Sequence, residues 1–135
     1  MVIPRTLAAV ALLSAPALAR PPAGPVDPMI ATWFKSLQRD VDHFPCCSAA
    51  DCRKVEDVTE VGGKYRVKVK REDFTTDDSD QTKWAEKFGD QPFVWMEIEP
   101  SRLTIRGDNP TGSSVLCYSV WSADVYCFVP FITGG

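Results

Sequence analysis

Hydrophobic residues near the start of the chain recur with the period of a helix. Apolar residues follow one another at intervals of three and four: Ile30, Trp33, Phe34, Leu37 and Val41. This spacing places them on one face of an amphipathic helix. Asp27-Pro28 favours a helix start, because Asp accepts hydrogen bonds from free amides and Pro is preorganised for the first helical position. Phe44-Pro45 predicts the end of the helix, since proline disfavours helical backbone in the residue before it.

From Val55 onward, apolar and polar residues alternate with the period of a strand. Gly62-Gly63 favours a hairpin, because both central residues of a type I′ turn need positive φ. Further expected elements are a short helix between Asp80 and Gly89, a strand over 93–99, an edge strand over 103–106 and a hairpin of strands 114–120 and 124–130. We therefore expect an α+β fold, with one N-terminal amphipathic helix packed on a small antiparallel β-sheet of about four to six strands.

The first nineteen residues have the organisation of a cleavable signal peptide. Arg5 precedes an apolar run, and Ala17-Leu18-Ala19 matches the small-residue pattern at which signal peptides are cut. The run is shorter than the roughly 20 residues that a membrane span needs. We expect a signal peptide over 1–19, a Pro-rich leader over 20–26 and a single disulfide-stabilised domain over 27–135. The predicted location is periplasmic or secreted, with no membrane span after cleavage.

The charge of the chain narrows the choice of partners. Cleavage would remove Arg5 from the 15 Lys+Arg and leave the 18 Asp+Glu unchanged, so 14 − 18 gives a net charge of −4. Proteins that bind nucleic acid or anionic lipid surfaces usually carry a basic surface. The overall charge therefore argues against nucleic acid and against lipid as the partner.

Five cysteines in an exported chain are expected to form disulfides. Two bonds leave one spare thiol, which allows a monomer or a Cys-linked dimer. Cys117 and Cys127 lie opposite each other in the predicted C-terminal hairpin and could bond directly. Alternatively, the cluster of Cys46, Cys47 and Cys52 is bonded to those strands and fastens the helix to the sheet. Both arrangements remain open.

Two segments carry residues that could bind a metal. His43 with Cys46, Cys47 and Cys52 offers ligands that suit copper(I) or zinc, but the spacing matches neither C-x-x-C nor C-x-x-C-H. An acidic run could hold calcium, yet it lacks the glycine and distal glutamate of an EF-hand: Asp73, Asp77, Asp78 and Asp80. We expect structural disulfides, a solvated acidic loop, and no metal or cofactor.

Acidic and aromatic residues alternate on the predicted strand 93–99. Glu97 and Glu99 share one face with Phe93 and Trp95, and this face could stack a sugar or bind a cationic partner. Trp121 adds a further candidate aromatic, as do Trp84 and Phe88. We expect a binding module for an envelope protein or a glycan that uses Trp95, Glu97, Glu99 and Trp121, with no catalytic residue assigned.

Two other functions are kept as alternatives. A small glycan- or cell-wall-active enzyme would use Glu97 and Glu99 as its carboxylate pair, one of them with a raised pKa. A thiol- or metal-handling envelope protein would use the segment from Cys46 to Cys52.

Four segments carry a resemblance to other proteins: Trp33-Phe34-Lys35-Ser36-Leu37, Cys46-Cys47-Ser48-Ala49-Ala50-Asp51-Cys52-Arg53, Asn109-Pro110-Thr111-Gly112 and Val125-Tyr126-Cys127-Phe128-Val129-Pro130. The chain resembles a group of short exported proteins, mostly from alphaproteobacteria, with a C-C-x-x-x-D-C element and a C-terminal C…C-F-x-P segment. The likeness leaves out residues 73–90, which have the character of an insertion. The resemblance implies export and a bacterial envelope location, and it implies no particular activity.

Overall fold

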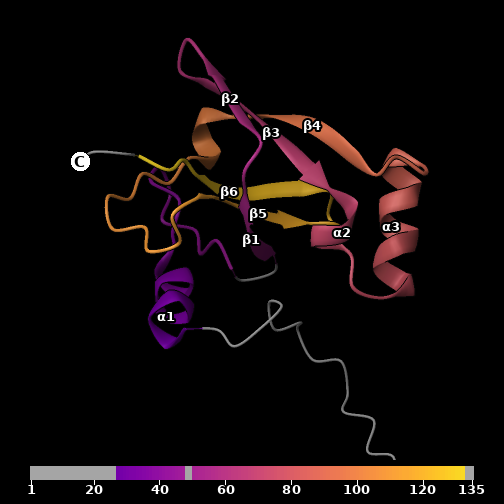
Figure 1. The fold of residues 1–135 in the computed structure, drawn as a ribbon, viewed down its shortest axis with the longest axis horizontal. Helices are drawn as coiled ribbons and strands as arrows, with labels where there is room; N and C mark the ends of the chain where they lie inside the picture. Colours follow the sequence, from indigo (N-terminus) through magenta and orange to yellow (C-terminus); the bar gives the residue numbers. More distant parts are fainter. Residues whose placement is uncertain (1–26, 48–49, 133–135) are drawn as a thin grey trace, which may run out of the picture.

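The computed structural model describes residues 27–47 and 50–132 (Figure 1). The predicted signal peptide (1–19) and leader (20–26) lie outside the described residues. The elements in chain order are α1 (Pro28–Ser36), β1 (Asp51–Val55), β2 (Val58–Val61), β3 (Lys64–Lys70), α2 (Arg71–Phe74), α3 (Asp78–Phe88), β4 (Phe93–Ile98), the 3-10 helix η1 (Pro100–Arg102), β5 (Ser114–Ser119) and β6 (Asp124–Val129).

The six strands form two antiparallel sheets of three strands each, β1-β5-β6 and β2-β3-β4. The α+β class and the antiparallel pairing are therefore confirmed, whereas the expected single sheet with one main helix is wrong. Residues 103–106 do not form the expected edge strand, since only Leu103 makes an isolated bridge, to Phe128. Both predicted hairpins are present, and Gly62 and Gly63 have φ values of 59° and 80°, as the tight turn requires.

Helix α1 begins as the sequence predicts but ends eight residues early. Asp27 accepts a hydrogen bond from the Met29 amide at 2.8 Å, and Pro28 occupies the first turn. Beyond Ser36, the backbone becomes extended and folds back on itself, and the Arg39 amide donates to the Phe44 carbonyl at 3.0 Å. Val41 lies on this turn with 64% of its surface exposed. Its place in the apolar stripe was a wrong prediction, because the chain leaves the helix before reaching it.

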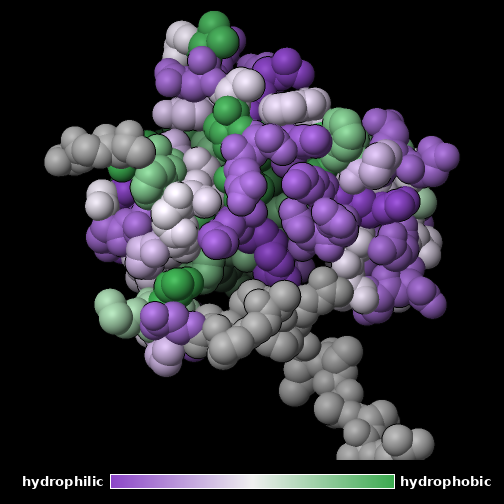
Figure 2. Space-filling model, viewed as in Figure 1, coloured by the Kyte–Doolittle hydropathy of each residue, from purple (hydrophilic) through white to green (hydrophobic). Residues whose placement is uncertain are grey.

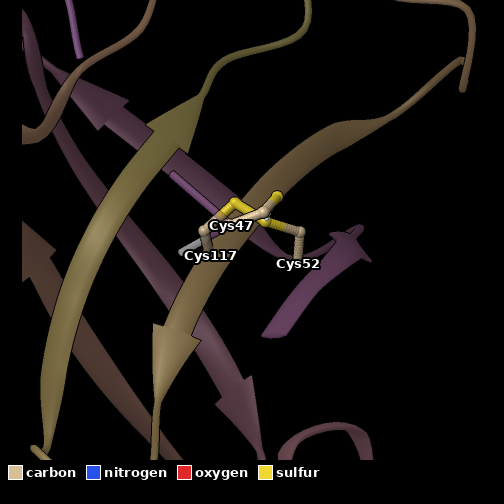
Figure 3. Close-up of side chains that lie close together, drawn as sticks. All are labelled: Cys47, Cys52 and Cys117. Atoms are coloured by element: carbon tan, nitrogen blue, oxygen red, sulfur yellow. Dashed lines mark hydrogen bonds between the residues drawn. A yellow bond between two sulfur atoms is a disulfide. The ribbon is translucent and has the colours of Figure 1, made fainter. Parts of the chain in front are cut away.

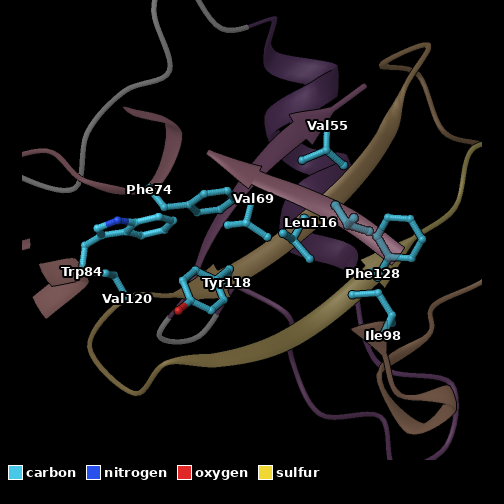
Figure 4. Close-up of a cluster of buried hydrophobic side chains, with 10 residues drawn as sticks. Val55, Val69, Phe74, Trp84, Ile98, Leu116, Tyr118, Val120 and Phe128 are labelled. Carbon is cyan, nitrogen blue, oxygen red and sulfur yellow. The ribbon is translucent and has the colours of Figure 1, made fainter. Parts of the chain in front are cut away.

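The two faces of the β1-β5-β6 sheet are covered by different elements. One face carries Leu116 and Tyr118 and meets the other sheet through Val69 and Ile98 (Figure 4). The opposite face carries Val115 and Cys117 and packs against Trp33 and Leu37, at α1 and its end. The layers thus run from α1 through the β1-β5-β6 sheet to the β2-β3-β4 sheet.

The segment from α2 to α3 belongs to the core. Phe74 and Trp84 are fully buried, and the Trp84 indole donates to the Gln91 carbonyl at 2.8 Å. Figure 2 shows mostly hydrophilic residues over α3, which fits a helix that buries only a narrow stripe. Asp77 caps the helix by accepting from the Asp80 amide at 2.9 Å. Within the described segments, no helix is long and apolar enough to cross a membrane.

Candidate functional site

Two disulfides fasten the loop after α1 and strand β1 to the C-terminal hairpin. Cys46 is bonded to Cys127 on β6, and Cys52 is bonded to Cys117 on β5. Of the two arrangements that the sequence left open, the structure has the one in which the Cys46–Cys52 cluster is bonded to the strands of the C-terminal hairpin. Cys117 and Cys127 do lie opposite each other, as expected, but they do not bond to each other. Strand β5 is the central strand of its sheet, so Cys117 also lies opposite Cys52 on β1. It is Cys52 that forms the disulfide with Cys117.

Disulfides persist in oxidising compartments and are rare in the cytosol. The two bonds therefore indicate folding outside a reducing compartment, as the sequence predicts.

Cys47 keeps a free thiol next to one of these disulfides (Figure 3). Its Sγ lies 2.8 Å from Sγ of Cys52, which carries no hydrogen because it is oxidised. The Cys47 thiol also contacts the Phe34 carbonyl at 3.3 Å, as donor. Burial of the sulfur, followed by the nearby Asp51 carboxylate, raises the pKa of Cys47 to about 11. The thiol is therefore protonated at neutral pH.

The cysteines that come together differ from those that the sequence grouped. The sulfur atoms of Cys47, Cys52 and Cys117 all lie within 4.8 Å of one another. Cys46 is buried and bonded to Cys127, so it does not join them. In the described structure, Cys47 is the one free thiol, and oxidised sulfurs are poor metal ligands. A metal site of His43 with Cys46, Cys47 and Cys52 is therefore not assembled.

Residues from β3 and β4 form a second candidate site on the outer face of the β2-β3-β4 sheet. Phe93 and Trp95 alternate along β4 and remain 40% and 41% exposed. Register places Lys68 opposite Trp95 and Lys70 opposite Phe93. Together with Arg66, these residues are called the basic-aromatic face below.

Cations on this face lie against the aromatic rings. Lys68 Nζ is 4.1 Å from the centre of the Phe93 ring, and Arg66 Cζ is 5.9 Å from that of Trp95. Such contacts hold the rings and the cationic groups side by side. A shallow pocket of about 280 Å³ lies at one end, lined by Lys68, Lys70, Arg71, Glu72, Pro92 and Phe93.

The two predicted carboxylates lie toward the other end of β4. Glu97 is opposite Arg66 in register and forms an exposed ion pair with Lys64, Nζ to Oε1 3.8 Å. Glu99 lies beyond the strand and immediately precedes η1. Both line a shallow pocket of about 330 Å³ with Lys87, Phe88, Met96, Arg102, Ala123, Asp124 and Val125. The structure thus brings Glu97 and Glu99 to one pocket, whose other charged residues are Lys87, Arg102 and Asp124.

The predicted aromatic residues do not gather at one surface. Trp121 lies in the turn between β5 and β6 with 60% of its surface exposed, and its indole donates to Asp80 at 2.9 Å. Trp84 is fully buried and is therefore excluded as a binding residue, contrary to expectation. Of the predicted ligand-binding residues, Trp95 and Glu97 share the outer face of the sheet.

The acidic run does not form a solvated loop. Asp77 and Asp78 begin α3, and Asp80 is buried. The Asp80 carboxylate accepts from the amide and hydroxyl of Thr76 at 2.9 and 2.8 Å, and from the Trp121 indole. These oxygens hold α3 and the β5–β6 turn in place, so the segment serves the fold.

Sequence reasoning missed the cationic part of the basic-aromatic face. The alternation of β3 already places Arg66, Lys68 and Lys70 on one side, facing water. The sequence pattern does not give the register between β3 and β4. This register places the cations beside Phe93 and Trp95. In comparisons with known proteins, no family model matches the chain, and no curated protein or solved structure matches it significantly.

Proposed function

We propose that this chain is a small exported binding module, periplasmic or secreted, that binds an acidic glycan through the basic-aromatic face. The observation that carries the proposal is the pairing of exposed aromatic rings with cations on a sheet whose other side is packed against the core. A paired strand holds such side chains at fixed spacing, so little conformational entropy is lost on binding.

The chemistry of the face selects the class of ligand. Pyranose rings present a flat apolar side of C–H groups, which stacks on an exposed indole or phenyl ring. The three cations of β3 would pair with carboxylates along an acidic glycan. The charge of these three residues is opposite to the net charge of the whole chain, while Lys68 also pairs with Asp57 at 3.9 Å and Glu97 lies on the same face. The cations also disfavour the cationic partner that Glu97 and Glu99 alone would suggest.

Trp95→Ala tests the proposal in a titration calorimeter with oligogalacturonate as the probe and a neutral dextran oligomer of equal length as the reference. We expect wild type to bind the acidic oligomer alone, and Trp95→Ala to weaken that binding at least about tenfold, because a central aromatic carries much of the energy of an interface. Lys68→Gln with Lys70→Gln should weaken binding and flatten its salt dependence.

Trp121→Ala is the matched control, since it removes an exposed indole from another part of the surface. Equal losses for Trp95→Ala and Trp121→Ala would contradict the proposal, as would binding of a single-stranded oligonucleotide in place of the glycan. If the wild-type protein shortens the oligomer and the double variant Glu97→Gln with Glu99→Gln does not, the chain would instead be an enzyme.

A further inference from the structure

We propose that Cys47, Cys52 and Cys117 form a thiol–disulfide exchange site, in which Cys52 forms its disulfide with either Cys117 or Cys47. This activity is independent of glycan binding.

Proximity is the first argument. Disulfides exchange when a thiolate attacks one sulfur of the bond, so the attacking sulfur must lie beside it. Cys47 Sγ lies 2.8 Å from Cys52 Sγ, and Cys117 Sγ is within 4.8 Å of both. The second disulfide is bonded between Cys46 and Cys127 and is not part of this group. The free thiol of Cys47 therefore lies next to only one of the two disulfides, and its nearest sulfur there is that of Cys52.

The reaction balances without any further reactant. The Cys47 thiolate donates an electron pair to Cys52 Sγ and forms a new S–S bond. The Cys52–Cys117 bond breaks, and its electron pair leaves on Cys117 Sγ. Cys117 then takes up a proton in place of the one that Cys47 released. The protein has two disulfides and one thiol before and after, so neither an oxidant nor a reductant is consumed.

The two states differ in where the thiol lies and in what is cross-linked. In the structure, the free thiol belongs to an exposed residue, and Cys52–Cys117 joins β1 to β5 at directly opposed positions. After exchange, the thiol would belong to Cys117, which is fully buried, and β1 would be held to β5 by backbone pairing and packing alone. Exchange therefore moves the free thiol from an exposed residue to a buried one and releases a cross-strand bond.

The surroundings of Cys47 set the rate. Its thiol contacts the Phe34 carbonyl of α1, and Asp51 of β1 is the charged group that acts on it among the described residues. Burial of the sulfur, followed by the Asp51 carboxylate, favours the protonated thiol and raises the pKa of Cys47 to about 11. The thiolate fraction, and with it the exchange rate, should rise about tenfold per pH unit from neutral pH toward that value.

The test follows which cysteine is free in the exported full-length protein. Oxidised protein is incubated between pH 7 and pH 10, quenched with acid, alkylated with N-ethylmaleimide in acidic denaturant and digested with trypsin without reduction. Cys46, Cys47 and Cys52 fall in peptide 40–53, and Cys117 and Cys127 fall in peptide 107–135. We expect the alkylated cysteine to change from Cys47 to Cys117 as incubation proceeds, at a rate that rises about tenfold per pH unit. The Cys46–Cys127 disulfide should stay intact.

Two variants make the test decisive. Cys117→Ala should contain a Cys47–Cys52 disulfide and no alkylatable thiol, and Cys47→Ser should show no labelling of Cys117 at any pH. Two alkylatable thiols in oxidised Cys117→Ala would overturn the proposal. So would labelling of Cys46 and Cys127 at the same rate as Cys117, which would mean general scrambling.

Discussion

At the scale of single residues, the environment of each aromatic ring decides what it contributes. Trp84 and Trp95 both lie on segments with clear periodicity, yet one is fully buried and the other is exposed. The sequence pattern predicted the helix that carries Trp84 but not that α2 and α3 pack on the core, because that packing depends on contacts distant in the chain. The cations beside Trp95 could not be predicted for the same reason, because the pairing of β3 with β4 also depends on contacts distant in the chain.

Tyr118 carries a buried polar atom that is not hydrogen-bonded. The residue is 1% exposed, and its hydroxyl has no hydrogen-bond partner among the described residues. Burial, with a smaller effect of Asp124, raises the pKa of Tyr118 to about 12. Its ring still packs edge-on against Phe74, with centroids 5.5 Å apart. The ring therefore stabilises the core, and the hydroxyl does not.

Tyr118→Phe should leave the free energy of unfolding unchanged or raise it by up to about 1 kcal/mol, because it removes an unsatisfied buried group and keeps the ring. Urea denaturation measures the change. Trp84→Phe is the comparison: it loses the bond to Gln91 and leaves a void, so it should cost at least about 1 kcal/mol. A loss of more than 1 kcal/mol in Tyr118→Phe would show that the hydroxyl is bonded in solution.

At the scale of elements, local signals located most of the secondary structure, and long-range contacts decided its extent. The Asp27 cap and the Gly62-Gly63 turn were readable because each acts within a few residues. The end of α1 was not, because Arg39 bonds to the Tyr126 carbonyl of β6 at 2.8 Å and holds the chain in a turn. The disulfide pairing could not be predicted from the sequence either, because Cys117 on the central strand β5 has a cysteine opposite it on each neighbouring strand.

The two disulfides should contribute strongly to stability because each closes a loop in the chain. Cys46 and Cys127 are 81 residues apart, but with Cys52–Cys117 intact the loop that their bond closes shortens to (52 − 46) + (127 − 117), or 16 residues, which stabilises the fold by roughly 3 kcal/mol in a chain-entropy treatment. Cys46→Ala with Cys127→Ala should therefore lower the free energy of unfolding by about 2–4 kcal/mol in urea denaturation. Cys47→Ala, which removes the free thiol of an exposed residue, should change it by less than about 0.5 kcal/mol. A loss below 1 kcal/mol in the double variant would mean that packing alone holds α1 to the hairpin.

At the scale of the whole molecule, the layer order explains why one face is available for binding. The β1-β5-β6 sheet lies between α1 and the β2-β3-β4 sheet, so both of its faces are buried. The β2-β3-β4 sheet buries one face only, and its outer face exposes the aromatics and cations. The α+β class was predictable from periodicity. The division into two sheets was not, since strand order depends on which sheet each hairpin joins.

The same layers separate the two proposed activities. The exchange site lies where the loop after α1 meets β1 and β5, and the basic-aromatic face belongs to the other sheet. Cys47→Ser should therefore leave glycan binding intact, and Trp95→Ala should leave thiol exchange intact.

The most direct test of the binding surface is an NMR titration of the isotopically labelled protein with oligogalacturonate. The account predicts that the largest amide shifts fall on β3 and β4, and that the indole N–H of Trp95 shifts more than that of Trp121. Shifts centred on the Trp121 turn, or no shifts at millimolar oligomer, would contradict it.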